Sequence, residues 1–384
     1  MSELTFYEFF AGGGMARVGL GSGWRCLFAN DLSPKKAAAY RANFGGDDLH
    51  VGDVHAVTPA MLPGRADLAW GSFPCQDLSL AGAKAGLAGA RSGAFWGFWN
   101  AVLQLKAEGR APKTLVLENV CGALTSRGGR DFASIGAALS DAGYRFGALV
   151  VDAALFLPQS RPRLFIVAIA DDVEPPASAV DPAHGAPSAF RPKALHMAHA
   201  ALGPAARKAW IWWRLSPPRV NVRALEDIVE DDPATAPWRA PHETEALLAL
   251  MAPLHRARIE SLKASQVRRV GAVYRRMRLD ASGAKVQRAE ARFDGVAGCL
   301  RTPAGGSSRQ TLLVIENGVV RSRLMSAREA ARLMGLDDAY ALPSNYNDAY
   351  RLAGDGVAVP VVRFLAHELL EPLLGRGAAA RRTA

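Results

Sequence analysis

The sequence predicts an α/β protein built on a mainly parallel sheet, followed by a smaller and less regular part. Two observations carry this prediction. Short apolar runs alternate with helical patterns between residues 4 and 170. Beyond residue 170 the alternation stops, and Pro, Gly, Arg and Trp become frequent. Strands that alternate with helices favour a parallel sheet covered on both faces, and 384 residues are enough for two domains.

Six strands and three helices are expected in the first 170 residues. The predicted strands are LTFYEFF (4–10), RCLFAN (25–30), DLAWGSF (67–73), KTLVLENV (113–120), FGALVVDA (146–153) and RLFIVAIA (163–170). The predicted helices are PKKAAAYRANF (34–44), GAFWGFWNAVLQLK (93–106) and DFASIGAALSDAG (131–143).

The rest of the chain divides where its composition changes. Residues 171–191, rich in Pro, Ala and acidic residues, indicate a linker. Helical patterns return at residues 326–336 and 359–374. The predicted domains are 1–172, a smaller irregular region over 173–325, and a closing segment over 326–384 that returns to the first domain.

The chain is basic, with 46 Lys and Arg against 36 Asp and Glu and a formal net charge of +10. This excess favours a polyanionic partner, although a basic surface without such a partner explains it equally well. Long apolar runs and an N-terminal signal pattern are absent, which predicts a soluble cytoplasmic protein. The four cysteines lie far apart and never as CxxC, so neither a metal site nor a disulfide framework is expected.

The first predicted strand ends in a run of glycines, FFAGGGMARVGL. Gly12 to Gly14 let the backbone turn tightly and approach a ligand, although a purely structural turn explains them about as well. Asp31 ends the second strand, where this architecture has its ribose-binding acid, and Asp53 follows in GDV, where it can reach an adenine amino group. The GxGxxG spacing of dinucleotide sites is absent. A nucleoside without a pyrophosphate is therefore favoured, such as S-adenosylmethionine.

Three further stretches carry reactive or charged groups. FPCQDLS puts Cys75 on a stiff turn after an apolar run, as a free thiol whose nucleophilic form is the thiolate. LENVCGAL puts Glu118 and Asn119 at the carboxyl end of a strand, where parallel sheets bind ligands. LPQSRPRLFIV puts Arg161 and Arg163 just before the next strand. Taken singly, a buried cysteine, a capping glutamate and a surface arginine pair explain these residues as well.

In this order and spacing, FAGGG, FPCQ, LENV and QSRPR resemble the motifs of the DNA cytosine-5 methyltransferase family, over residues 1–170 and 321–370. The resemblance implies a Rossmann-like methyltransferase domain that binds S-adenosylmethionine, together with a smaller target-recognition domain. It implies methyl transfer to C5 of a cytosine in a specific short DNA sequence. A base inside a duplex cannot reach such a pocket, so the cytosine has to be flipped out.

The resemblance also implies catalytic roles. Cys75 adds to C6 of the cytosine and makes C5 nucleophilic, while Glu118 holds N3 and the exocyclic amine. Arg163 contacts the base or its sugar-phosphate. Pro74 fixes the turn, and Gln76 begins a loop that can close over the DNA. Arg161 supports Arg163, and Asn119 is the further predicted catalytic residue at the end of the strand.

The cofactor motifs carry over in the same way, with some departures. AYRLAGDGVAVPVV resembles the family's last motif but has Asp355 where Asn is usual. RLMSAREAARLMGL resembles an RxLTxRE pattern, with Met325 and Ser326 at its Leu-Thr positions. No metal is expected. The predicted cofactor-binding residues are Phe10, Ala11, Gly12, Gly13, Gly14, Asp31, Leu32, Asp53, Val54, Phe73, Pro74, Asp355, Gly356 and Val357.

The region between these motifs has no family pattern, and this is where the family keeps target recognition. WIWWR (210–214) and VRRVGAVYRRMR (267–278) mix aromatic residues with Arg, which suits base stacking and phosphate binding. The Trp residues are explained at least as well as the core of the smaller region. RTPAGGSSRQT (301–311) is either a reading loop or a plain loop. The predicted DNA-binding residues are Ser79, Arg275, Arg276, Arg309 and Gln310.

Double-stranded DNA is the predicted partner, a cognate restriction endonuclease is a further one that the resemblance allows, and the chain is expected to be a monomer. One alternative is an RNA (tRNA) cytosine-5 methyltransferase of the same fold, which the long Arg- and Trp-containing insert disfavours. A second alternative is a DNA-binding relative without activity. The presence of Cys75, Glu118 and Arg163 argues against it. A third, a cysteine hydrolase, lacks a histidine within any motif.

Overall fold

In the computed structural model, the described residues are 3–74, 93–183, 185–219, 222–279, 282–301 and 309–376. The chain forms two compact units. The first comprises Met1–Asp152, Pro162–Arg219 and Val357–Ala384, and the second comprises Ala153–Arg161 and Val220–Gly356. The predicted domain limits at residues 172 and 325 fall inside these units rather than between them. The functional division into catalytic and target-recognition domains stays a prediction.

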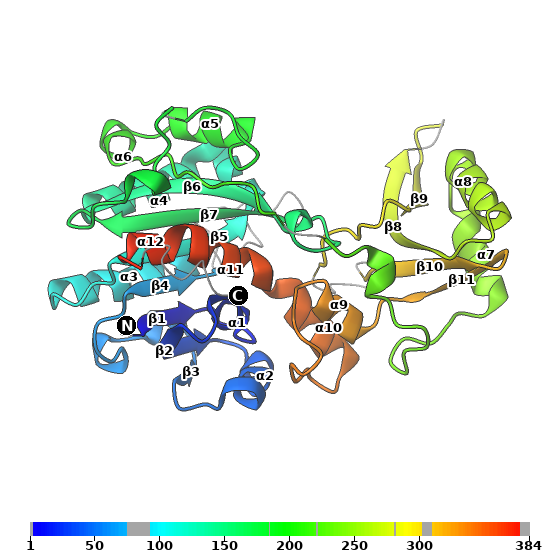
Figure 1. Cartoon of the computed structure of the whole chain (residues 1–384), viewed down its shortest axis with the longest axis horizontal. Helices are drawn as coiled ribbons and strands as arrows, with labels where there is room; N and C mark the ends of the chain where they lie inside the picture. The colour runs from blue at the N-terminus through cyan, green and yellow to red at the C-terminus, as the bar shows by residue number, and fades with distance from the viewer. Residues whose placement is uncertain are drawn as a thin grey trace. The chain divides into compact units, whose positions relative to one another are not determined.

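A seven-stranded sheet forms the centre of the first unit (Figure 1). Its order is β3-β2-β1-β4-β5-β7-β6, and β7 runs antiparallel to β5 and β6. The predicted α/β class and all six predicted strands are confirmed, whereas the three residues of β3 give no sequence pattern. The bounds are β1 Leu4–Phe9, β2 Trp24–Asp31, β3 Leu49–Val51, β4 Leu68–Gly71, β5 Thr114–Val120, β6 Tyr144–Asp152 and β7 Pro162–Ala170.

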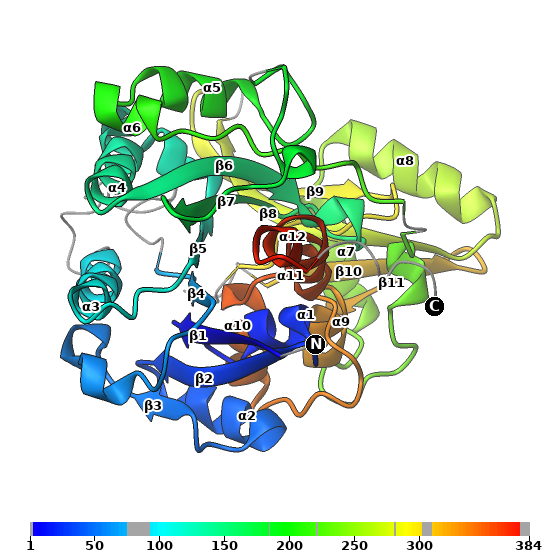
Figure 2. The same cartoon turned by 60° about the vertical axis from the view of Figure 1, so that its left-hand side comes forward.

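Helices cover both faces of this sheet. Figure 2 shows α3 and α4 on one face, and α1, α11 and α12 on the other. The fit of α11 on α1 is close, since a Cβ added at Gly19 would lie 2.4 Å from Cβ of Val362. The bounds are α1 Met15–Leu20, α2 Pro34–Phe44, α3 Ala94–Ala107, α4 Arg130–Asp141, α5 Lys193–Ala200, α6 Pro204–Lys208, α11 Val359–Leu365, the π-helical Ala366–Leu370, and α12 Glu371–Leu373.

The segment 173–219 packs on the seven-stranded sheet and belongs to the first unit. The N–H of Ile211 donates to the Phe146 carbonyl at 2.6 Å. Trp213 is fully buried, and its indole N–H donates to the Val167 carbonyl at 3.1 Å. The expectation that the WIWWR cluster forms the core of the smaller region is therefore wrong. Composition marks such a segment as irregular, but it does not reveal which sheet the segment covers.

The second unit contains a four-stranded antiparallel sheet in the order β11-β10-β8-β9. Its apolar face packs on α7 and α8. The prediction of an irregular region is wrong here, because frequent Arg, Pro and Gly residues hide the strand periodicity. The bounds are α7 Pro241–Ala249, α8 Pro253–Ala264, β8 Arg269–Leu279, β9 Lys285–Arg292, β10 Thr311–Glu316, β11 Val319–Leu324, α9 Ala327–Arg332 and α10 Tyr346–Asp355.

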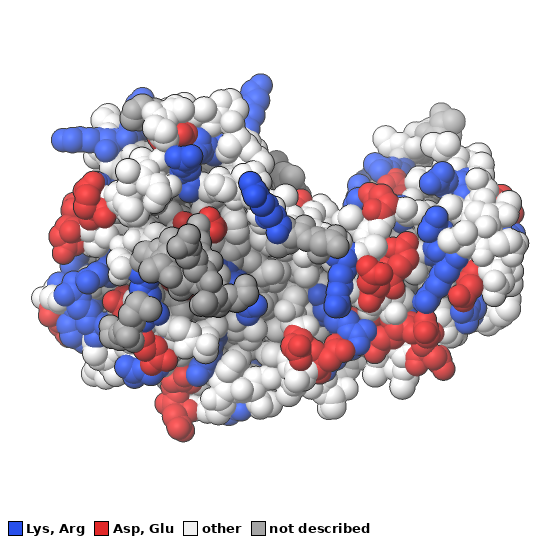
Figure 3. All heavy atoms as spheres, in the orientation of Figure 1, with Lys and Arg blue, Asp and Glu red and all other residues white. Residues whose placement is uncertain are grey.

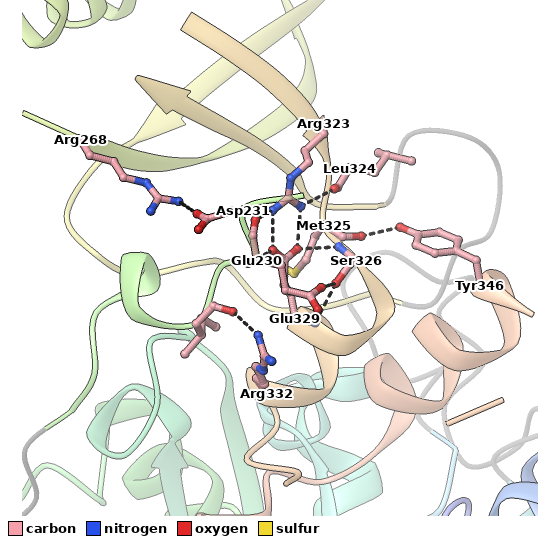
Figure 4. Close-up of polar contacts among 11 residues, drawn as sticks. Glu230, Asp231, Arg268, Arg323, Leu324, Met325, Ser326, Glu329, Arg332 and Tyr346 are labelled. Atoms are coloured by element: carbon pink, nitrogen blue, oxygen red, sulfur yellow. Dashed lines mark hydrogen bonds and ion pairs between the residues drawn. The ribbon is translucent and has the colours of Figure 1, made fainter. Parts of the chain in front are cut away.

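A buried ion pair joins β11 to α9 in the second unit (Figure 4). The side chains of Arg323 and Glu329 are 0% exposed, and their nearest N and O atoms lie 2.6 Å apart. Glu329 also accepts the N–H of Ser326, the N-cap of α9, at 2.7 Å. It accepts the N–H of Glu230 at 2.7 Å as well. The pair therefore connects three separate stretches of the unit.

Candidate active site

The candidate site is built at one edge of the seven-stranded sheet. From β1 the sheet grows outwards through β2 to β3, and β4 then lies on the other side of β1. Ligands of α/β proteins bind outside the carboxyl ends of the strands at such a change of direction. The glycine turn follows β1, and Phe73 and Pro74 follow β4, so these two segments lie on the two sides of this point.

The turn after β1 has a left-handed backbone. Phe10, Gly12 and Gly14 have φ values of 60°, 58° and 75°. A Cβ at Gly14 would lie 2.4 Å from the Phe44 ring of α2, so packing also demands glycine there. Phe10 has a side chain in this region of φ, which costs on the order of 1–3 kcal/mol and is common at ligand-binding turns. Ala11 and Gly13 complete the same turn.

Asp31, the last residue of β2, hydrogen-bonds the backbone of the glycine turn. Its Oδ2 accepts the Gly12 N–H at 2.8 Å, and its Oδ1 accepts the Ser33 N–H at 2.8 Å. Each carboxylate oxygen keeps a further lone pair, so Asp31 can still accept a hydroxyl group. The next side chain, Leu32, is 70% exposed. An acceptor beside an exposed apolar side chain fits the sugar and the base of a nucleoside.

Asp53 presents a second acceptor beyond β3. Its side chain is 62% exposed. The backbone N–H and the ring of His55 lower the pKa of Asp53, with the N–H donating to its Oδ1 at 2.9 Å. Asp53 is therefore an anion at neutral pH and can accept from an amino group. Val54 differs, since it is 4% exposed and its side chain packs in the core.

Beneath the turn lies Glu8, a buried carboxyl group that no sequence motif singles out. It is 1% exposed, and its Oε2 has no hydrogen-bond partner among the described residues. Burial raises the pKa of Glu8 to about 8, although the backbone N–H of Arg17 opposes this shift. The carboxyl group is therefore mostly protonated in the folded chain at neutral pH.

We expect Glu8→Gln to weaken the pH dependence of stability. Above the ordinary pKa of 4.5 the unfolded chain has lost this proton, whereas the folded chain keeps it up to about pH 8. The proton's stabilising contribution is complete below the unfolded pKa and is lost as the pH rises through the folded pKa. Urea unfolding near pH 6 and above pH 8 should show the wild type losing on the order of 2 kcal/mol more than the variant. Equal losses would show that Glu8 ionises normally.

Glu118 and Arg163 lie together at the carboxyl edge of β5. In the antiparallel register Val120 faces Arg163 and Glu118 faces Phe165, so the two charged side chains are diagonal neighbours on one face. Nε of Arg163 lies 3.4 Å from Oε1 of Glu118, and their side chains are 15% and 10% exposed. A carboxylate and a guanidinium in such a sheltered place can hydrogen-bond a planar polar ring.

Asn119 connects this edge to the end of β4. Its side-chain N–H donates to the Phe73 carbonyl at 3.4 Å, and its Oδ1 accepts the Val120 N–H at 2.8 Å. Phe73 is 4% exposed and its ring packs 5.5 Å from that of Phe95. Pro74 follows it with an exposed side chain. The predicted site residues Cys75, Gln76 and Ser79 lie outside the described residues, and their roles stay predictions.

Arg161 is bound within the second unit. It is 3% exposed, and its guanidinium donates to the carbonyls of Leu300 at 3.1 Å, Gly354 at 2.9 Å and Gly356 at 2.7 Å. Gly354 and Gly356 flank the exposed Asp355. Arg161 thus positions the backbone of the predicted C-terminal cofactor motif, a role that only the structure reveals. Val357 follows as a buried residue of the first unit.

Two predicted DNA-binding residues precede β10. Arg309 lies with its guanidinium 5.5 Å from the Tyr346 ring centroid. Gln310 is 5% exposed, and its backbone N–H donates to the Tyr350 hydroxyl at 2.9 Å. Gln310 is therefore largely buried in this structure, and its base-reading role stays a prediction. The sequence does not indicate that Gln310 is buried, because RQTLLV is equally compatible with an exposed polar residue at the end of a loop.

The remaining predicted DNA-binding residues, Arg275 and Arg276, are exposed on β8. On the face shown in Figure 3, basic and acidic side chains are interspersed over both units. Net charge alone therefore does not mark one DNA-binding surface. Within the described ranges, no cluster of three or more His, Cys, Asp or Glu residues could hold a metal ion. None of the helices described is long and apolar enough to span a membrane.

Comparison with known proteins identifies the family. The chain matches the C-5 cytosine-specific DNA methylase family over residues 4–371. It is 26% identical to the Type II methyltransferase M.HpaII of Haemophilus parainfluenzae, over 97% of this chain and 90% of that protein. It is 26% identical to M.NlaX of Neisseria lactamica, over 94% and 95%. The Entamoeba histolytica methyltransferase EhMeth shares the fold, with a TM-score of 0.63 at 12% identity, over 98% of this chain and 99% of that one.

Fold and comparisons place the chain in the class of α/β methyltransferases. Within that class it belongs to the C-5 cytosine-specific DNA methylase family and is a DNA cytosine-5 methyltransferase. Enzymes of this family take the methyl group from S-adenosylmethionine. The family resemblance predicted from FAGGG, FPCQ, LENV and QSRPR is confirmed, and DNA is the substrate in preference to the RNA alternative.

Proposed function

We propose that Cys75, Glu118 and Arg163 methylate a cytosine that has been flipped out of duplex DNA, within one short target sequence. The observation that supports this most is the sheltered pair of Glu118 and Arg163, 3.4 Å apart. Asn119, the residue after Glu118, donates to the carbonyl of Phe73, and Phe73 lies two residues before Cys75 in the chain. This link between β5 and the end of β4 supports the proposal that Cys75 acts with Glu118 and Arg163.

The proposed reaction begins with addition of the Cys75 thiolate to C6 of the cytosine. The ring loses its aromaticity, and electron density moves to C5. Glu118 hydrogen-bonds N3 and the exocyclic amine, which offsets the charge that develops as sulfur adds. Bound S-adenosylmethionine supplies an electrophilic methyl group for C5. Loss of the C5 proton then lets Cys75 leave C6 and restores the aromatic ring.

The residues at the ends of β1, β2 and β3 fit this cofactor. The glycine turn approaches without side chains, Asp31 has acceptor capacity for ribose hydroxyls, and Leu32 offers an apolar surface to the adenine. Asp53 can accept the adenine amino group. We propose Phe10, Ala11, Gly12, Gly13, Gly14 and Phe73 as the backbone around the methionine end. Asp355, Gly356 and Val357 stay predicted cofactor-binding residues.

We further propose that the chain acts as a cytoplasmic monomer and protects the target of a partner restriction endonuclease. The Type II designation of the relatives supports this pairing.

Bisulfite sequencing of plasmid DNA from cells that express the protein tests the proposed methylation of cytosine. We expect protected cytosines in one short recurring sequence. Complete conversion of every cytosine, with folded protein present, would overturn the proposal.

Glu118→Gln should slow methyl transfer by about 100-fold or more while DNA binding persists. The amide keeps the shape but cannot share a proton with N3 in the same way. Single-turnover methylation and duplex binding separate the two effects. Glu174→Gln, at an 85% exposed side chain of the first unit, is the matched control and should retain the wild-type rate. A wild-type rate for Glu118→Gln would remove this residue from the mechanism.

A further inference from the structure

Strands β8 and β9 continue past the rest of their sheet as a two-stranded ribbon. Among the described strands, β10 pairs with β8 only from Arg269 to Val273. In contrast, β9 pairs with β8 as far as Leu279. We call Tyr274–Leu279 and Lys285–Glu290 the ribbon. Figure 1 shows the two strands reaching beyond β10 and β11. The hydrogen bond from the Ala289 N–H to the Leu250 carbonyl, 3.0 Å long, anchors the ribbon's base.

The ribbon has a composition that folding does not explain. It carries five basic side chains against a single carboxylate, Glu290. Met277 and Leu279 are 58% and 68% exposed and share a face with Arg275, so they are not part of the face that carries Arg276. An excess of exposed cations over carboxylates indicates an anionic partner. The major groove of DNA is lined by phosphates and presents guanine edges that arginine binds.

The two faces of the ribbon differ. Residues directly opposite each other on paired strands share a face. Ala289, opposite Arg275, belongs to the core under α7 and α8, so Arg275 lies on the helix-covered face. Arg276 and Arg288 face each other on the opposite face, which we call the uncovered face because α7 and α8 pack on the other one; Arg276 is exposed and Arg288 half-buried. The sequence neighbours Arg275 and Arg276 therefore cannot contact one surface together.

The uncovered face carries arginines held in a weak, exchangeable arrangement. Glu290 accepts from Nε of Arg278 at 2.8 Å and lies 3.8 Å from Nε of Arg276. The side chains of Arg276 and Arg278 are 52% and 49% exposed, so water screens these pairs. A guanine edge or a phosphate can replace Glu290 at little cost, because arginine binds both with two parallel hydrogen bonds.

We propose that the β8–β9 ribbon enters the major groove of the DNA target and reads it with Arg276 and Arg288. A groove about 12 Å wide admits a two-stranded ribbon. The inference rests on the function proposed above and adds the element that selects the sequence. An acidic protein surface as the partner of this ribbon is the competing outcome of the test.

The test compares three forms of the full-length protein. The first is wild type, the second is Arg276→Ala with Arg288→Ala, and the third is the control Arg25→Ala with Arg65→Ala. The control removes the same charge from exposed sites at the amino ends of two parallel strands, since Arg25 is the second residue of β2 and Arg65 precedes β4. Binding to a labelled duplex is measured over a salt series, together with S-adenosylmethionine binding and bisulfite patterns in expressing cells.

For the ribbon variant we expect binding at least about tenfold weaker near physiological salt, and a salt slope smaller by about 2. Its methylation pattern should relax at one or more positions of the target, while S-adenosylmethionine binding stays at the wild-type value. Arg276→Lys with Arg288→Lys should restore the salt slope but leave the target relaxed, since lysine keeps the charge without the bidentate geometry.

Glu290→Gln tests the same proposal independently, in case the double Ala variant does not fold. It frees the arginines, so duplex binding should tighten about threefold or more. Ribbon variants that match the Arg25 and Arg65 control in affinity, slope and pattern would overturn the ribbon proposal and leave the function intact. A wild-type protein that binds duplex DNA but methylates none would overturn the proposed function alone. Wild type that binds no duplex would overturn both.

Discussion

We expect Cys75→Ser to slow methyl transfer by at least about 10³-fold and to leave S-adenosylmethionine binding unchanged. The hydroxyl group is almost never deprotonated near neutral pH, whereas a thiol has a small but highly nucleophilic thiolate fraction. Without addition at C6, C5 stays part of an aromatic ring and does not accept the methyl group. The measurement is transfer of a labelled methyl group to plasmid DNA.

The matched control for this variant is Cys121→Ser. Cys121 lies at the end of β5 in the first unit and is partly buried, and burial raises the pKa of its thiol. The Cys121→Ser variant undergoes the same exchange of sulfur for oxygen, and its rate of methyl transfer should stay within a few-fold of the wild-type rate. A duplex with 5-fluorocytosine at the target gives a second readout, because the missing C5 proton prevents release of the enzyme. Wild type should form a denaturant-resistant adduct, and an adduct with Cys75→Ser would disprove the assignment.

We expect Arg323→Ala to destabilise the second unit by about 3–5 kcal/mol. The variant leaves Glu329 buried with no guanidinium against it, and an unpaired buried charge is expensive. It also removes the guanidinium from the Glu230 carbonyl, to which it donates (Figure 4). Hydrogen exchange of the β10 and β11 amides reports the opening free energy of this unit by itself.

Arg268→Ala is the control for this prediction. Arg268 pairs with Asp231 at 2.7 Å, close to the 2.6 Å of the buried pair, but these side chains are 36% and 85% exposed. The loss should stay within about 1 kcal/mol, since exposed pairs contribute little. Replacing both buried partners, as Arg323→Met with Glu329→Gln, removes the buried charges and keeps an amide oxygen that can accept from Ser326 or Glu230, so it should recover part of the stability. If Arg323→Ala costs no more than Arg268→Ala, the network does not hold the unit together.

The sequence by itself determined six of the seven strands of the first unit and the family. These strands are short apolar runs, most of them next to a helical pattern, so local periodicity is sufficient, whereas the three residues of β3 carry no such pattern. The closeness of Glu118 and Arg163 was not predictable in this way. Arg163 stands at the start of β7 and Glu118 near the end of β5, and they meet because β7 runs antiparallel to β5.

Only the tertiary structure decided what long-range packing controls. The WIWWR segment covers the seven-stranded sheet, Gln310 is buried, and Arg161 binds carbonyls around Asp355. In each case the partner lies far away in the sequence, and an Arg, Gln or Trp side chain suits a surface and an interior equally well. The β8–β9 ribbon falls between the two cases. Its residues DASGAK carry a turn signal, but which of its arginines face outward depends on where α7 and α8 cover the sheet.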